Sequence, residues 1–117
     1  MSIEQLKHRM QLFAVEVIRF AGTMPRYGTY QVISNQLVRA ATSVGANYRA
    51  TCRAKSRADF LSKMKVVEEE CDESIYWLEL LEKMGRVDPP AIAALLKEGN
   101  EILSIVVASI KTARSAH

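Results

Sequence analysis

Apolar residues recur along the chain in alternating steps of three and four over four long stretches. This spacing places each set on one face of a helix and is typical of amphipathic α-helices. The first stretch shows the pattern with Leu6, Met10, Phe13, Val17 and Phe20. The pattern predicts helices over about residues 3–21, 29–54, 57–84 and 89–114.

Helix-breaking and helix-capping residues fall between these stretches. The segment GTMPRYG, which contains two glycines and a proline, separates the first two. Ser56 is a candidate N-cap for the third helix, because a hydroxyl there accepts a hydrogen bond from a free backbone N–H. Gly85 is a natural C-terminal stop. Asp88 followed by Pro89 is typical of a helix start.

Four long helices joined by short connections are typical of an antiparallel bundle. We therefore expect an all-α, up-down-up-down four-helix bundle that occupies residues 1–117 as a single domain. The composition agrees, because 49% of the residues are hydrophobic and 25% are charged, which excludes a disordered chain. No apolar run approaches the roughly 18 residues that a membrane span needs. We expect a soluble, cytoplasmic protein with no membrane contact.

Residues that could support catalysis are sparse. The two histidines, His8 and His117, have no carboxylate or cysteine at metal-ligand spacing. Cys71 lies on the apolar seam of its helix, where we expect it to be a core side chain. The five glycines are isolated, so no glycine-rich phosphate loop is present. We expect no catalytic residue, no metal site and no cofactor, and therefore a protein that is not an enzyme.

Charge is distributed unevenly, although the net charge is only +3. Residues 49–65 carry six basic side chains and one acidic side chain, whereas residues 68–82 carry seven acidic side chains and no basic one. Cations that neutralise phosphates release counterions, which gives salt-sensitive binding of RNA or DNA. The alternatives are an ordinary solvated surface or a docking site for a protein. The candidate nucleic-acid-binding residues are Arg39, Arg49, Arg53, Lys55, Arg57, Lys63 and Lys65.

Apolar residues outside the core seams predict self-association. When each helix is wound at about 100° per residue, several bulky side chains fall opposite the seam that faces the core. A second stripe of this kind is typical of an interface, although scattered surface apolar residues are the alternative. We expect a homo-oligomer with closed symmetry. The candidate interface residues are Leu12, Val15, Ile18, Val66, Trp77, Leu80 and Met84.

Two motifs resemble those of a known family. The second helix carries QLVRAATSVGAN at residues 36–47, and the third begins with SRADFLSK at residues 56–63. They resemble the Gln-Leu-x-Arg-Ala-Ala-x-Ser-Ile core, the Asn that follows it and the Ser-x-x-(Asp/Glu)-Phe helix start of the four-helix bundle family named for the 23S rRNA intervening-sequence protein. Residues 69–81, EECDESIYWLELL, look like one branch of that family. Many members continue after the Asn with Ile-Ala-Glu-Gly, where this chain has YRAT, so no role of that Glu-Gly pair transfers.

The resemblance implies a homopentameric ring, which is the typical assembly of that family. The chain is also similar to the accessory proteins of diversity-generating retroelements, which share the bundle, form basic barrels, and bind nucleic acid and a reverse transcriptase. This similarity implies that the basic residues contact RNA or DNA. The alternative is a protein-interaction scaffold or accessory subunit, for example of a reverse transcriptase, with no nucleic-acid binding of its own.

Overall fold

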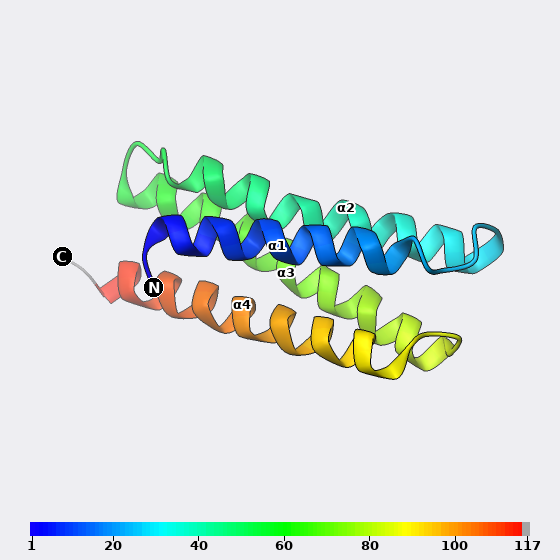
Figure 1. The fold of residues 1–117 in the computed structure, drawn as a ribbon. Coiled ribbons are helices and arrows are strands. Elements are labelled where there is room, and N and C mark those ends of the chain that lie inside the picture. Colours follow the sequence, from blue (N-terminus) through cyan, green and yellow to red (C-terminus); the bar gives the residue numbers. More distant parts are fainter. Residues whose placement is uncertain (116–117) are drawn as a thin grey trace.

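The computed structural model describes residues 1–115, and among these residues all regular secondary structure is α-helical. The helices are α1 (Ile3–Ala21), α2 (Gly28–Thr51), α3 (Arg57–Met84) and α4 (Pro89–Ser115). They run antiparallel in chain order and form a slender bundle of 49 × 22 × 21 Å (Figure 1). The predicted up-down-up-down four-helix bundle is therefore confirmed. Within the described part of the chain, no helix has the length and apolarity to cross a membrane.

The helix ends form where the capping residues predict them. The hydroxyl of Ser56 accepts a hydrogen bond from the backbone N–H of Asp59 at 3.0 Å. The carboxylate of Asp88 accepts one from the backbone N–H of Ala91 at 3.3 Å. Gly85 ends α3 with φ of 83°, a conformation that suits a residue without a Cβ. Local sequence signals thus set both turns that flank α3.

The second helix is shorter than predicted. The pattern predicts a helix to residue 54, but α2 ends at Thr51. The backbone N–H groups of Arg53 and Ala54 bond to the carbonyls of Ala50 and Thr51, three residues earlier, which tightens the chain into a turn. Arg53 and Lys55 therefore lie in a turn at the end of the bundle and not on the side of a helix.

The core contains one apolar seam from each helix. All five seam residues of α1 are buried, as predicted. The three-and-four spacing from Ile92 predicts a seam in the fourth helix through Leu96 and Leu103, but these two are only partly buried. Leu95 and Ile102 are buried in their place. Gly99 lies four residues after Leu95 and three before Ile102, so a helix of 3.6 residues per turn places it on the same buried line of α4. A search for bulky apolar residues does not detect this position, because glycine has no side chain.

Gly99 lets α4 approach its neighbours closely. A Cβ at this position would lie 3.2 Å from Cγ1 of Ile75 and 3.5 Å from Cζ of Phe13. The thiol of Cys71 donates to the carbonyl of Gly99 at 3.5 Å. Burial raises the pKa of Cys71 to about 12, so this thiol stays protonated at neutral pH. Cys71 is a core side chain, as predicted.

The seam between α1 and α4 is the least extensive of the four helix contacts. Arg9 joins these two helices, with its Nε and Nη2 atoms each 2.7 Å from a carboxylate oxygen of Glu98 and with a further bond to Glu101. The hydrogen bonds that Arg9 donates to Glu98 raise the pKa of Arg9 above its usual value. This forked contact, made by one guanidinium, links α1 to the middle of α4.

We predict that Gly99→Val destabilises the protein by about 1–3 kcal/mol, because the added methyl groups overpack a site already in contact with Ile75. Denaturant unfolding at fixed protein concentration measures the change. Gly45→Ala is the control, since a Cβ there lies at an ordinary 3.4 Å from Cβ of Met10. A Gly99→Val protein as stable as the wild type would contradict the close packing of α4.

Candidate nucleic-acid interface

The structure divides the seven candidate basic residues into two groups. Three of them form ion pairs with carboxylates of α3. The pairs are Arg39 with Glu70 (3.1 Å) and Glu73, Lys63 with Asp59 (2.8 Å), and Lys65 with Glu68 (3.0 Å). Arg39 thereby joins α2 to α3, and its charge is largely matched within the protein. These three residues are weaker candidates for binding a polyanion than their sequence positions suggest.

The other four, Arg49, Arg53, Lys55 and Arg57, are exposed and form no ion pair with any residue from 1 to 115. They lie where α2 ends and the chain turns into α3. The last turns of α4 end at the same end of the bundle (Figure 1). We call this surface the basic end and define it by Arg49, Arg53, Lys55, Arg57, Lys111 and Arg114.

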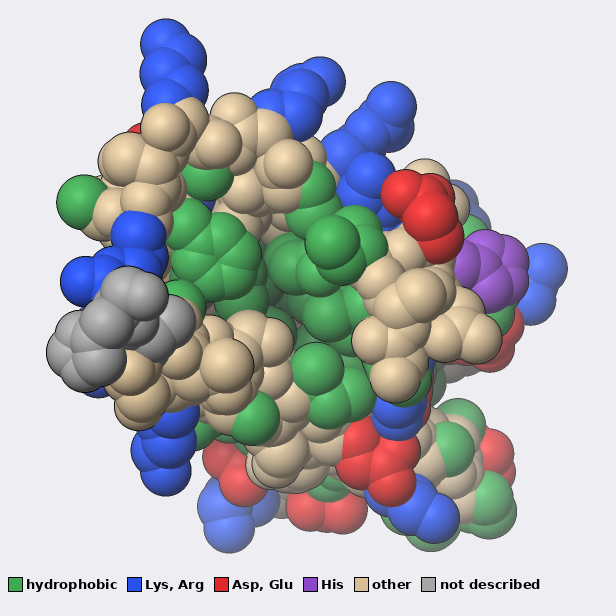
Figure 2. All heavy atoms as spheres, turned by 90° about the vertical axis from the view of Figure 1, so that its left-hand side faces the viewer, with side chains coloured by type: hydrophobic (Ala, Val, Ile, Leu, Met, Phe, Trp, Pro, Cys, Tyr) green, Lys and Arg blue, Asp and Glu red, His purple; other side chains and the backbone are tan. Residues whose placement is uncertain are grey.

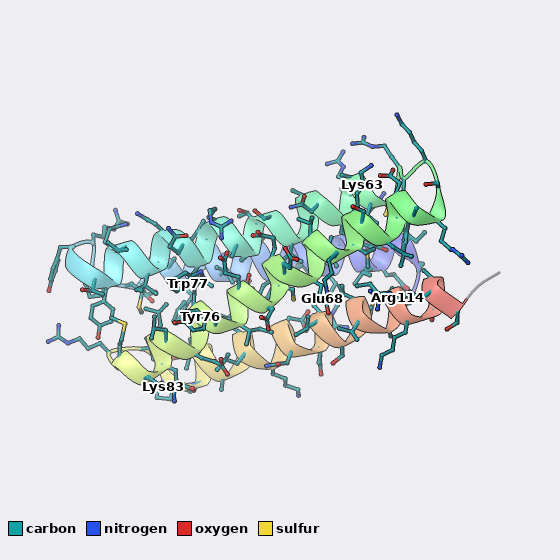
Figure 3. The ribbon with its side chains drawn as sticks, turned by 180° about the vertical axis from the view of Figure 1, so that it is seen from behind. Lys63, Glu68, Tyr76, Trp77, Lys83 and Arg114 are labelled. Atoms are coloured by element: carbon teal, nitrogen blue, oxygen red, sulfur yellow. The ribbon has the colours of Figure 1, made fainter. Side chains whose placement is uncertain are left out.

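Figure 2 shows this end of the bundle, with Lys and Arg side chains around its rim and apolar side chains towards its centre. Lys111 and Arg114 are exposed and make no ion pair with a described residue. In Figure 3, Lys63 and Arg114 lie towards this end, whereas Lys83 lies at the other end of α3. The prediction from sequence missed Lys111 and Arg114. The antiparallel helix order would have placed them here, since the fourth helix ends where the second ends.

Two physical features keep this end positive. Cations near the carboxyl ends of α2 and α4 interact favourably with the partial negative charge of a helix C-terminus. The nearby carboxylate of Asp59 is engaged elsewhere, because it accepts hydrogen bonds from Nζ of Lys63 and from the backbone N–H of Lys55. These bonds lower the pKa of Asp59 below its usual value. Asp59 therefore stabilises the turn and leaves the neighbouring arginines unmatched.

The predicted interface residues also divide into two groups. Leu12, Val15, Ile18 and Val66 are exposed, with Leu12 and Ile18 each 49% accessible. The first three form a stripe along the outer side of α1, as expected. We call Leu12, Val15 and Ile18 the α1 stripe. No partner covers it in the single chain, so its role in self-association stays a prediction.

The prediction that three side chains of α3 lie opposite the core is wrong. Trp77, Leu80 and Met84 are all partly buried and pack against the core. The physical reason is that α3 packs against both α2 and α4, so it turns a wider sector inward than one seam requires. The Trp77 ring also meets the Tyr76 ring edge-on, with centroids 5.0 Å apart. These residues support the bundle whether or not a second copy contacts them.

An apolar groove of about 660 Å³ lies between α1 and α4, beyond the contact that Arg9 makes. Its lining includes Phe13 and Phe20 of α1 and Leu95 of α4. Leu12 belongs both to this groove and to the α1 stripe. The groove and the stripe therefore form one continuous apolar surface.

The fold and its surface define a class: an all-α bundle with a basic end and an exposed apolar stripe. The chain belongs to the 23S rRNA-intervening sequence protein family, whose sequence profile matches residues 5–108. A crystal structure of a protein of unknown function from the S23 ribosomal protein family of Bacteroides thetaiotaomicron is similar, with a TM-score of 0.81 and 30% identity over 91% of this chain and 98% of that chain. No curated protein matches the chain. The family expected from the motifs is thus confirmed.

We predict that Arg39→Met lowers the free energy of unfolding by up to about 1 kcal/mol, because it breaks a partly exposed pair of contacts between α2 and α3. Arg53→Met, a matched change at a residue without an ion pair, should stay within about 0.5 kcal/mol of the wild type. Denaturant titration followed by circular dichroism measures both. The reverse order of effects would show that the two groups of cations are assigned wrongly.

Proposed function

We propose that the protein is a non-enzymatic homo-oligomer, with five subunits as the family resemblance implies, that binds the phosphate backbone of RNA or DNA through its basic end. The observation that carries this proposal is the set of four exposed cations that pair with no carboxylate of residues 1–115, Arg49, Arg53, Lys55 and Arg57. Arginine suits this role because its planar guanidinium can contact two phosphate oxygens together.

Several physical features support backbone binding over base reading. The cations lie on a turn and on helix ends, so they present positive charge without a helix or strand projecting to enter a groove of the nucleic acid. Each phosphate contact contributes roughly 0.9 to the slope of log K against log salt for duplex DNA. A ring of subunits repeats the same surface, which multiplies the contacts without adding sequence preference.

RNA is the first probe to use. The family name refers to 23S rRNA, and the similar crystal structure is assigned to a ribosomal protein family. A labelled RNA duplex and a DNA duplex of equal length distinguish the two kinds of nucleic acid. Binding that falls steeply with salt is the expected result for a surface that contacts several phosphates.

We predict that combined charge reversal of Arg49, Arg53 and Arg57 to Glu lowers RNA affinity at low salt by about 100-fold or more, since each change replaces a phosphate contact with repulsion. Fluorescence polarisation measures binding, and circular dichroism checks that helix content is retained. The matched control reverses Arg26, Lys83 and Lys97, which are exposed and form no ion pair within residues 1–115. The net charge changes equally in both proteins. If the two triple variants bind alike, the basic end is not the binding surface.

For assembly, we predict that Leu12→Asp combined with Ile18→Asp shifts the oligomer to monomer and leaves helix content intact, because both side chains are exposed in the single chain. Val32→Asp is the control, since Val32 is a large exposed residue of α2 outside the α1 stripe. Size exclusion with light scattering measures the mass. A double variant that keeps the wild-type mass would exclude the α1 stripe from the interface.

A second candidate function is a protein-interaction scaffold or accessory subunit, for example of a reverse transcriptase, that binds no nucleic acid. The apolar groove between α1 and α4 favours it, since exposed apolar grooves accept helices of partner proteins. Capture of one partner that survives nuclease treatment and is lost on Ala94→Glu, a change within the groove, would support this function.

A further inference from the structure

A second groove, of about 550 Å³, lies between α1 and α2. Gly45 and Ala46 line it from α2, and Lys7 and His8 line it from α1. The two helices approach closely at its base, because Cβ of Met10 lies 3.4 Å from where a Cβ of Gly45 would be. Small residues on one side and long polar side chains on the other thus leave a hollow on the surface.

Arg49 connects this groove to the basic end. It lines the groove and is also one of the four exposed cations that form no ion pair within residues 1–115. With Lys7 and His8 it supplies nitrogen donors from two helices to one hollow. Thr42 also lines the groove, but its hydroxyl already donates to the carbonyl of Val38 at 2.8 Å. The donors available to a ligand are therefore the basic side chains and the amide of Gln11.

The charge of this groove sets it apart from the groove between α1 and α4. In the α1–α2 groove, the described residues of the lining include one acidic side chain, Glu4, against Lys7 and Arg49. In the α1–α4 groove, three carboxylates face two arginines. The first groove therefore favours an anion and the second does not. The polar lining also suits a hydrated anion better than an apolar side chain.

We propose that the α1–α2 groove seats one phosphodiester group of the bound nucleic acid, with Lys7, His8 and Arg49 as its donors. This inference rests on the proposed nucleic-acid binding and extends the binding surface from the α2–α3 turn onto α1. A phosphate placed here continues the path of the backbone across the basic end, because Arg49 lies in the last turn of α2 and Arg53 lies in the turn that follows it.

Glu4 is the competing anion in this site. Its carboxylate lies 3.2 Å from Nζ of Lys7, and its side chain is 82% accessible. Exposed ion pairs of this kind contribute little stability, so a phosphate that contacts three donors displaces the carboxylate from Lys7. Removal of the Glu4 charge should therefore strengthen binding.

The first experiment compares Glu4→Gln with Glu16→Gln. Each change removes a carboxylate that pairs with the basic residue three positions later on the same helix, Lys7 or Arg19. Both raise the net charge by one, but Glu16 lines the other groove. We expect Glu4→Gln to tighten binding of a labelled RNA duplex by about two- to fivefold, and Glu16→Gln to have a smaller effect.

The second experiment places a charge in each groove. Ala46→Glu adds a carboxylate to the α1–α2 groove, and Ala94→Glu adds one to the α1–α4 groove. Both alanines are exposed helical residues, so both variants should fold, which circular dichroism checks. We expect Ala46→Glu to weaken binding by about tenfold and to lower the salt slope by about 1, the loss of one phosphate contact. Ala46→Gln, which fills the same space without charge, should weaken binding less.

The outcomes separate this inference from the proposed function. If wild-type protein binds RNA but either pair of variants shows equal effects, the phosphate site in the α1–α2 groove is overturned and the basic end stands. If wild-type protein does not bind nucleic acid at low salt, both are overturned. Larger effects of Glu4→Gln and Ala46→Glu than of their controls support the site.

Discussion

The structure depends on the burial of one apolar seam from each of four long helices along a single narrow core. Three of the helix contacts are extensive, and Gly99 brings α4 close to Ile75 of α3 and to Phe13 of α1. The remaining contact, between α1 and α4, is less extensive and is bridged by Arg9. Because the bundle is 49 Å long and only about 22 Å wide, the charged side chains of residues 1–115 lie on its outer faces and its two ends.

That shape explains why the acidic and basic blocks of the sequence pair with each other only where they meet, at Lys65 and Glu68. The rise of a helix separates Arg57 from Glu79 by about 33 Å along α3. This distance is several times the Debye length of about 8 Å at physiological salt. The carboxylates in the middle of α3 instead pair with Arg39 of α2, and the cations of the turn remain unmatched. The basic end of the bundle therefore combines cations from the end of α2, the turn that follows it, the start of α3 and the end of α4.

The two grooves on either side of α1 differ in chemistry although they share a helix. Towards α4, where the helices separate, apolar side chains line the hollow and carboxylates outnumber arginines. Towards α2, small residues line it and basic side chains outnumber the carboxylate of Glu4. One side of α1 therefore suits an apolar protein surface and the other suits an anion. The proposed assembly through the α1 stripe and the proposed nucleic-acid binding through the α1–α2 groove would use neighbouring parts of one face of α1, because Val15 follows Gln11 of the groove lining by four residues.

The sequence by itself determined the fold class, the four helices to within about one turn, the capping residues and most of the core, because these depend on contacts between residues three or four apart along one helix. It also located the basic turn, since its four basic residues lie within the nine positions from Arg49 to Arg57. The ion pairs of Lys63 and Lys65 lie within one helix, but only the tertiary structure decided the pairing of Arg39. Arg39 pairs with Glu70, 31 positions away, and Arg114 reaches the basic end from another helix. The partial burial of Trp77 was likewise decided by the packing of α3 against two neighbours, which the periodicity of a single helix does not contain.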